Sequence, residues 1–229
     1  EKPLADTAAA AAAIRDAGRD AGAVVAVCHT LRFMEPFATI RRRVAAGAVG
    51  TLVHLEHMEA IGHIRFTHNY VRGQWGDARV NTELLIHKCC HDIDFLAWLA
   101  GAPCESVASS GSLAFFHPDR APADAAAHCL DCQRNDRCPY SALRLYVDTD
   151  RAAWPARTIS VDHSREAHLA AVRDGPWNRC VWRAGNTVVD HQAVLLAFAG
   201  GATATCTLSG YSATNGRRLR IQGTEGELF

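Results

Sequence analysis

Residues 23–28 read Ala-Val-Val-Ala-Val-Cys, and the next five residues are His-Thr-Leu-Arg-Phe. The first run is short, continuous and apolar, which is typical of a strand buried on both faces of a parallel sheet. An alanine-rich stretch, residues 8–19, comes before it and predicts a helix that Gly18 and Gly22 help to end. A helix followed by a buried strand is the second half of a βαβ unit. We therefore expect the chain to open inside an α/β domain that it contains only in part.

The sequence after residue 30 has the pattern of a second, mainly antiparallel sheet. Residues 51–61 alternate apolar and polar side chains, as a half-buried strand does. Two later apolar runs, residues 187–198 and 202–211, flank Gly200-Gly201 and predict a β-hairpin. Further strands are expected over residues 105–116 and 217–222, helices over residues 35–46 and 82–99, and a polar, aromatic loop over residues 66–79.

Composition excludes several classes of protein. The 229 residues carry 24 Lys and Arg against 24 Asp and Glu, so a nucleic-acid or anionic-membrane surface is not expected. No apolar run approaches the length of a membrane span. Nine cysteines are an odd number in a chain long enough to build a core, which favours a reducing, cytoplasmic compartment over a disulfide framework. Only Lys2 and Lys88 are lysines, so each is examined as a candidate functional group.

Both lysines lie in segments that could carry chemistry. Lys2, in Glu1-Lys2-Pro3, could polarise a substrate oxygen, although its spacing alone favours a flexible, solvated terminal lysine. Lys88 lies between His87 and His91 on the helix expected over residues 82–99, and residues three and four apart share a helix face. Histidine beside lysine is plausible acid–base equipment at neutral pH. The alternative is a partly buried helix whose polar groups are satisfied.

Four cysteines have the spacing of a metal site. Cys129-x2-Cys132-x5-Cys138, with Cys180 further along, could supply four thiolates to one structural zinc ion. Such a site would tie a long loop to the body of the fold. Free thiols or an iron–sulfur cluster are the alternatives.

The loop His68-Asn-Tyr70-Val-Arg72-Gly-Gln-Trp75 combines aromatic faces with hydrogen-bond donors. That combination would suit a sugar or another polyol, and loops often carry such sites. A surface loop that folds back on itself is the alternative. The sequence contains no Gly-x-Gly-x-x-Gly, no Walker A loop and no Gly-x-Ser-x-Gly motif.

Taken together, these motifs resemble those of the Gfo/Idh/MocA family of NAD(P)-dependent oxidoreductases. The resemblance covers essentially the whole chain and includes an Arg-Phe-x-x-Pro pattern at residues 32–36. It implies catalytic roles for Lys2, Lys88 and His91, cofactor contacts for Glu1, Lys2 and Pro3, and substrate contacts for Arg32, His68, Tyr70, Arg72 and Trp75. The family commonly has an aspartate where this chain has His87, so the assignment of acid and base stays open.

The resemblance also implies a fold that combines α/β and α+β parts. Residues 1–30 would be the C-terminal remnant of a dinucleotide-binding Rossmann domain. Residues 31–229 would form a substrate-binding and oligomerisation domain, incomplete at its C-terminus, with an open, mainly antiparallel sheet and helices on one face. The open sheet would pair subunits into a homodimer or homotetramer.

The implied activity is hydride transfer between NAD or NADP and a sugar, cyclitol or related polyol. Because the dinucleotide fingerprint is absent from this chain, we expect the chain alone not to bind NAD(P) appreciably. An NAD-dependent glycosidase of the same family and a non-catalytic assembly protein derived from it are the alternatives.

Overall fold

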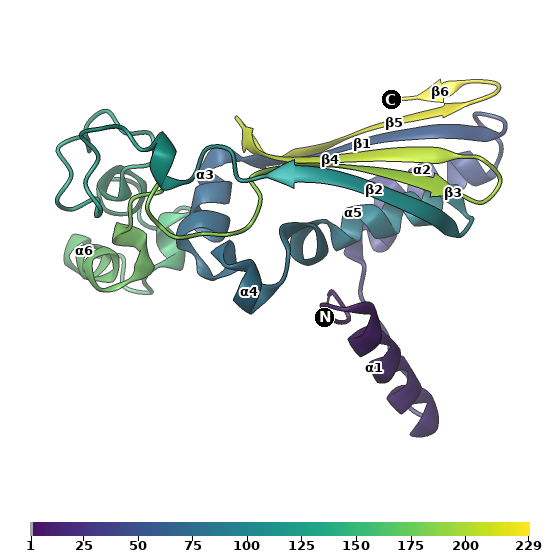
Figure 1. Cartoon of the computed structure of the whole chain (residues 1–229), viewed down its shortest axis with the longest axis horizontal. Helices are drawn as coiled ribbons and strands as arrows, with labels where there is room; N and C mark the ends of the chain where they lie inside the picture. Colours follow the sequence, from purple (N-terminus) through teal and green to yellow (C-terminus); the bar gives the residue numbers. More distant parts are fainter. Residues whose placement is uncertain (1) are drawn as a thin grey trace.

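The computed structural model describes residues 2–229 and is built on one six-stranded mixed sheet (Figure 1). The strand order is β2-β3-β4-β1-β5-β6. The strands are β1 (Leu52–Gly62), β2 (Cys104–Ser112), β3 (His191–Phe198), β4 (Thr203–Ser212), β5 (Gly216–Gly223) and β6 (Glu227–Leu228). All neighbouring pairs are antiparallel except β1 with β4, so the predicted open, mainly antiparallel sheet is confirmed.

The predicted hairpin is formed by β3 and β4. Gly200 and Gly201 both have positive φ, +89° and +91°, which residues with a Cβ rarely adopt. The parallel pair, β1 and β4, places segments about 150 residues apart in the sequence side by side, with His57 opposite Cys206. Long separation is the usual requirement for parallel neighbours, because a tight turn cannot join them.

Two helices cover one face of the sheet. These are α2 (Glu35–Ala45) and α5 (Leu84–Ala100), as Figure 1 shows. Leu55 of β1, Phe95 and Leu96 of α5 and Ile221 of β5 are almost fully buried in the core between them. Burial of each such side chain stabilises the fold by about 1.5–3 kcal/mol. The opposite, outer face carries no helix within residues 2–229.

A helical lobe, made by residues 63–82 and 113–190, lies at one end of the sheet (Figure 1). Its helices are α3 (His63–Phe66), the π-helix η2 (Thr67–Arg72), η3 (Gln74–Gly76), α4 (Ala78–Asn81), η4 (Pro118–Arg120), the π-helix η5 (Leu143–Val147), η6 (Ala156–Thr158), α6 (Arg165–Asp174) and η7 (Pro176–Asn178). The loop predicted over residues 66–79 is therefore wrong. The segment is helical because Phe66, Tyr70 and Val71 are buried against the lobe and the sheet end.

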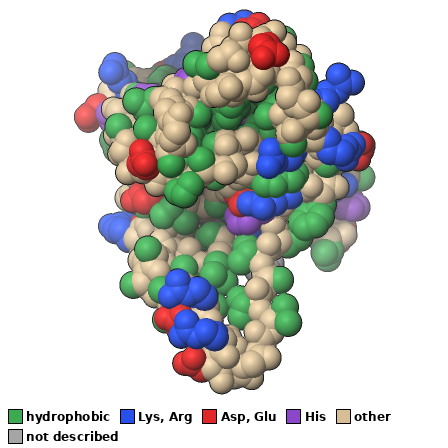
Figure 2. Space-filling model, turned by 90° about the vertical axis from the view of Figure 1, so that its right-hand side faces the viewer, with side chains coloured by type: hydrophobic (Ala, Val, Ile, Leu, Met, Phe, Trp, Pro, Cys, Tyr) green, Lys and Arg blue, Asp and Glu red, His purple; other side chains and the backbone are tan. Residues whose placement is uncertain are grey.

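The N-terminal segment corrects a second prediction. Helix α1 (Ala8–Asp20) forms, but residues 23–28 are extended without belonging to any strand, and Val24 is 95% exposed. The short 3₁₀ helix η1 (Thr30–Phe33) then leads to α2. Within residues 2–229 no strand lies beside residues 23–28, so their backbone has no ladder to join. This segment and α1 project from the rest of the molecule, below it in Figures 1 and 2.

Candidate active site

Helix α5 is the platform of the candidate site. It carries His87, Lys88 and His91, and it ends where Gly101 adopts a left-handed conformation. The Lys2 ammonium donates a hydrogen bond of 2.7 Å to the carbonyl oxygen of His87. The two lysines of the chain, 86 positions apart in the sequence, are thereby held on the same helix.

Lys88 is held from the other side by the sheet. Its ammonium forms an ion pair with Glu59 of β1, whose side chain is only 6% exposed. The second oxygen of Glu59 lies 3.1 Å from Nε of Arg217, on β5. Nε of Arg217 also donates to Asp92 at 2.6 Å, and His57 lies 2.8 Å from the same carboxylate. The result is a buried charge network of two carboxylates and two cations, with His57 beside it.

The network fixes the charge of Asp92. Burial alone would raise the pKa of Asp92, but hydrogen bonds from His57 and Arg217 lower it to about 2. The carboxylate is therefore ionised at neutral pH and balances Arg217. Sequence reasoning missed His57, Glu59 and Arg217 as members of the site. The available signal was that residues 55, 57, 59 and 61 share one strand face, so two polar side chains must point inward with Leu55 and Ile61.

The two histidines of α5 are in their base form at neutral pH. Burial, followed by the charges of Lys2 and Lys88, lowers the pKa of His87 to about 4. Burial and then Lys2 and His29 also lower the pKa of His91. His91 Nδ1 is buried and has no hydrogen-bond partner among the described residues. His91 is therefore an unprotonated imidazole that can accept a proton.

Arg32 lies at the edge of this site. Its guanidinium forms two hydrogen bonds of 2.7 Å to the carboxylate of Asp94 and lies over the ring of Trp98 at 5.4 Å. Asp94 is thus the partner of Arg32. A cavity opens beside it between the N-terminal segment and α5. Its lining is mostly apolar and comprises Pro3, Leu4, His29, Leu85, Ile86, Cys90, Ile93 and Asp94.

Two of the predicted substrate contacts, Tyr70 and Trp75, are brought to α5. The Trp75 ring stacks on His87 with 3.9 Å between centroids and 26° between planes. Tyr70 meets the same imidazole edge-on at 5.6 Å. His87 is therefore enclosed by aromatic rings, which explains much of its burial.

His68 and Arg72 lie away from α5, buried inside the lobe. His68 is 4% exposed and stacks on Trp177 at 4.5 Å. Its ring nitrogens lie 3.0 Å from the Tyr146 hydroxyl and 3.1 Å from the Thr158 hydroxyl. Both nitrogens are thus satisfied inside the lobe. The cause is the helical course of residues 67–72, which turns these side chains into the lobe core.

Arg72 lies among the cysteines. Its guanidinium donates to the Cys129 sulfur at 3.1 Å, to the Tyr140 carbonyl at 2.8 Å and to the Arg179 carbonyl at 2.7 Å. Arg72 is 2% exposed, so this contact set is internal to the lobe. The positive charge beside these cysteines is therefore the buried guanidinium of Arg72.

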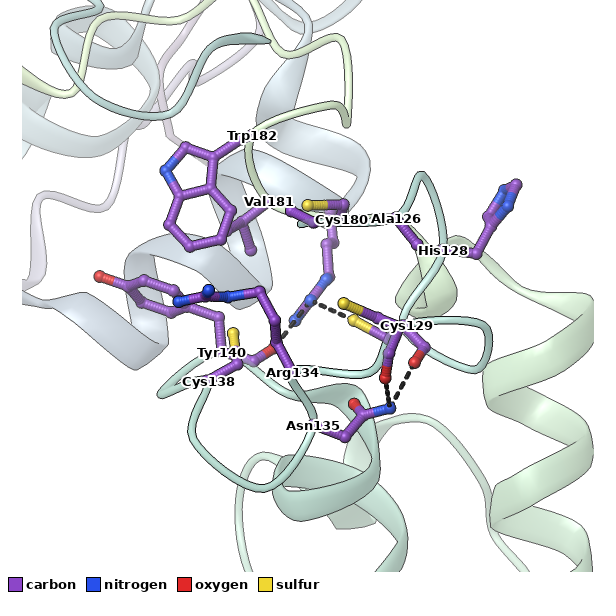
Figure 3. A pocket seen from close by; sticks show the side chains of 13 residues that line it. Ala126, His128, Cys129, Arg134, Asn135, Cys138, Tyr140, Cys180, Val181 and Trp182 are labelled. Carbon is purple, nitrogen blue, oxygen red and sulfur yellow. Dashed lines mark hydrogen bonds between the residues drawn. The ribbon is translucent and has the colours of Figure 1, made fainter. Parts of the chain in front are cut away.

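The four cysteines of the predicted zinc site lie around one cavity without forming a recognisable metal-binding group. Cys129, Cys132, Cys138 and Cys180 do line one cavity, but Figure 3 shows the sulfur atoms of Cys138 and Cys180 on different sides of it from Cys129. Among residues 2–229, no group of three or more His, Cys, Asp or Glu side chains is placed to hold a metal ion. The loop that carries Cys129 and Cys132 is held by hydrogen bonds from the Asn135 amide to the carbonyls of these two cysteines. The described residues therefore give the zinc prediction no support.

The three predicted cofactor contacts differ in where the structure places them. Pro3 lines the apolar cavity beside α5, and Lys2 is bound to that helix. Glu1 lies outside the described residues. No helix of the described chain is long and apolar enough to cross a membrane.

Comparison with known proteins agrees with this architecture. The pattern of an oxidoreductase family, that of the Gfo/Idh/MocA C-terminal alpha/beta domain, matches residues 41–229. YteT of Bacillus subtilis (strain 168), a protein named as an oxidoreductase, is 22% identical over 233 residues, which cover 100% of this chain and 53% of YteT. The uncharacterized protein y4oX of Sinorhizobium fredii is 34% identical over 109 residues, 47% of this chain and 29% of y4oX.

Solved structures share the fold. The oxidoreductase domain protein from Kribbella flavida has a TM-score of 0.60 at 19% identity, over 99% of this chain and 46% of its own. The apo scyllo-inositol dehydrogenase from Lactobacillus casei has a TM-score of 0.56 at 14% identity, over 99% of this chain and 46% of its own. The chain thus spans about half the length of YteT and of these two proteins.

Proposed function

This chain belongs to the Gfo/Idh/MocA oxidoreductase family, and from that premise we propose that the whole protein transfers a hydride between NAD(P) and a sugar, cyclitol or related polyol. The hydrogen bond from the Lys2 ammonium to the His87 carbonyl is the observation that carries the proposal. It holds a flexible cation on the helix that bears Lys88 and His91. These three residues are the proposed catalytic groups.

His91 is the proposed general base. Its lowered pKa leaves the imidazole unprotonated at neutral pH, so it can take the proton from a substrate hydroxyl as the carbon loses hydride. In the opposite direction the imidazolium returns that proton. Lys2 and Lys88 supply positive charge beside the substrate oxygen, where negative charge develops during the reaction. Glu59 holds Lys88 in place.

The cavity beside α5 fits the nicotinamide end of a dinucleotide. Pro3, Leu4, Leu85, Ile86 and Ile93 give it apolar walls, which suit a planar ring. A bound nicotinamide would accept or supply the hydride, which is the cofactor's own chemistry. Tyr70 and Trp75 position His87, and Arg32 with Asp94 borders the cavity.

Substitution of Lys2 and His91 in the full-length protein tests this mechanism. We expect His91→Ala and Lys2→Met to lower kcat by about 10²- to 10⁴-fold, the usual contribution of acid–base groups. The matched control is His163→Ala, since His163 is exposed on the lobe. Turnover that is undiminished in both variants would contradict the mechanism. Release of free sugar without net NADH would instead support the glycosidase alternative.

We also propose that residues 1–30 belong to a dinucleotide-binding domain and residues 31–229 to the substrate domain of a cytoplasmic homodimer or homotetramer. The exposed apolar side chain of Leu195, 48% exposed on the outer face, supports pairing through that face. Sedimentation of the full-length protein as a monomer would contradict this assembly.

A further inference from the structure

Arg217 lies between two buried carboxylates under helix α5. It stands opposite Glu59 in the register of β5 and β1, and its side chain reaches Asp92 of α5. Nε donates to one oxygen of Asp92 at 2.6 Å, and Nη2 donates to the other at 3.3 Å. The side chains of Glu59 and Asp92 are 6% and 0% exposed, so water does little to screen either charge. One guanidinium therefore serves both carboxylates.

Arg217 acts on the two carboxylates in different ways. Its Nε carries a single hydrogen, which is directed to Asp92, so Arg217 acts on Glu59 through its charge, at 3.1 Å. The Glu59 oxygen that faces Arg217 is buried and accepts no hydrogen bond from the described residues. The other Glu59 oxygen is the partner of Lys88. Glu59 is thus held between two cations, and removal of one changes where the other can lie.

Loss of Arg217 would change the surroundings of Lys88. Lys88 and Asp92 are four residues apart on α5, so the ammonium lies on the same helix face as the second carboxylate. Without Arg217, both Glu59 and Asp92 would attract this ammonium, and we expect it to move into the space between them. A misplacement of about 1 Å can cost a reaction about 10²-fold in rate.

Arg217 also belongs to the electrostatic surroundings of His91. Burial lowers the pKa of His91 most, Lys2, His29 and Arg217 lower it further, and Asp92 raises it. Arg217 therefore favours the unprotonated imidazole. The charged and titratable groups around His91, including those on its own helix face, are Lys2, His29, Lys88, Asp92, Asp94 and Arg217.

We propose that Arg217 is a positioning residue for the reaction on α5: it holds Asp92 and balances Glu59, and thereby fixes the Lys88 ammonium and adds positive charge near His91. This inference rests on the proposed function, which gives Lys88 and His91 their roles. Arg217 does not line the cavity beside α5, so it acts through its partners instead of touching a ligand there. An ion pair with a purely structural role would affect stability without changing the titration of His91.

An NMR titration of His91 in the full-length protein, without substrate, tests the electrostatic part. Arg217→Met removes a positive charge, so it should raise the pKa of His91, whereas Arg217→Lys should keep it near the value of the unmodified protein. Asp92→Asn should shift the pKa in the opposite direction. The exposed Arg173→Met on α6 is the matched control and should leave the titration unchanged.

Circular dichroism checks that each variant is folded. Arg217→Gln, which keeps an N–H donor for Asp92, takes the place of Arg217→Met if that variant does not fold. A His91 titration that is the same in the charge-removing variant and in the unmodified protein would overturn the proposal.

Kinetics with NAD⁺ and scyllo-inositol, the polyol in the name of the Lactobacillus casei relative, test the positional part. Arg217→Met should lower kcat about 10- to 100-fold with little change in KM, and should move the acid limb of the kcat/KM profile to higher pH. Arg217→Lys should restore the acid limb but only part of kcat, because an ammonium cannot bind both oxygens of Asp92 in parallel. Unchanged kcat in Arg217→Met would contradict the positioning role.

Failure of this inference can be told apart from failure of the proposed function. Undiminished turnover in His91→Ala would contradict the proposed function. Loss of turnover in His91→Ala, together with normal turnover and normal His91 titration in Arg217→Met, would contradict the role of Arg217 alone. If the unmodified protein does not turn over scyllo-inositol, the titration of His91 decides.

Discussion

The buried carboxylates of Glu59 and Asp92 neutralise two partly buried cations, Lys88 and Arg217, where α5 meets the sheet. A buried ion pair gives little net stability compared with an apolar pair, because both charges lose their hydration. Removal of one partner is different, since the other charge is then buried without compensation. The main effect of the network is therefore to fix the position of Lys88.

Glu59→Gln tests this dependence. We expect the substitution to lower the free energy of unfolding by about 3 kcal/mol, because it leaves Lys88 without a carboxylate partner while Arg217 keeps Asp92. Urea denaturation measures the change. Glu56→Gln is the matched control, since Glu56 lies on the same strand but is exposed on the outer face. Equal stability of the two variants would contradict the account.

His68 predicts a pH dependence of stability. Burial, followed by the charge of Arg72, lowers its pKa to about 4, whereas an unfolded histidine titrates near 6.5. Between these values the unfolded chain binds the additional proton, so stability is lost as the pH falls from about 6.5 to about 4. His87 contributes in the same direction, because its pKa is also about 4.

The pH dependence of urea unfolding measures this effect. His68→Gln should reduce the slope between pH 6.5 and 4 without abolishing it, since His87 remains. His163→Gln, at an exposed position, should leave the slope as it is. An NMR titration in which His68 of the folded protein takes up its proton near pH 6.5 would show that the imidazole is not desolvated.

At the scale of elements, β4 touches α3 through a glycine. A Cβ added at Gly210 would lie 2.5 Å from ring atoms of Phe66, which is fully buried. The ring cannot move outward, because Phe116 and Tyr70 pack against it. The close approach of sheet and lobe therefore requires glycine at this position.

Gly210→Ala should destabilise the protein by about 1–3 kcal/mol, the usual effect of overpacking a core. The control is Gly216→Ala on β5, where an added Cβ meets no atom within 4 Å. Chemical denaturation of the two variants compares them. If Gly210→Ala were as stable as Gly216→Ala, the contact with Phe66 would not constrain the interface.

The elements differ in how far the sequence predicts them. β1, α5 and the β3–β4 hairpin follow from local patterns, because alternation, helical spacing and paired glycines each act within about ten residues. Residues 67–72 were expected as a loop because their polar side chains, His68 and Arg72, suggested solvent. The lobe supplies buried partners for both, and those partners are about 70–110 residues away in the sequence.

The residues of the candidate site could also be predicted only where they lie close together in the sequence. His91 and Lys88 follow from spacing along one helix, whereas Glu59 and Arg217 reach Lys88 only through strand register. The four cysteines have the spacing of a zinc knuckle. Spacing does not reveal that the Arg72 guanidinium donates to Cys129 within the same cavity.

At the scale of the whole molecule, the segment before α2 differs from the rest. Val24 and Val25 are 95% and 44% exposed, and residues 23–28 have the composition of a buried strand but no strand neighbour within residues 2–229. An apolar, extended segment of this kind is suited to join a sheet. In the proposed organisation that sheet belongs to the dinucleotide-binding domain, of which residues 1–30 are part.

Hydrogen exchange can show whether residues 23–28 join the sheet of a preceding domain or remain unpaired. In a protein limited to residues 1–229, the amides of residues 24–28 should exchange at nearly unprotected rates, since none of them donates a backbone hydrogen bond to another residue that the structure describes. In a longer protein that includes a preceding Rossmann domain, the same amides should be protected by the strand ladder, while the amides of β4 should be protected in both. Equal exchange of residues 24–28 in the two proteins would show that the segment is a linker, and the boundary proposed at residue 30 would then have to move toward the N-terminus.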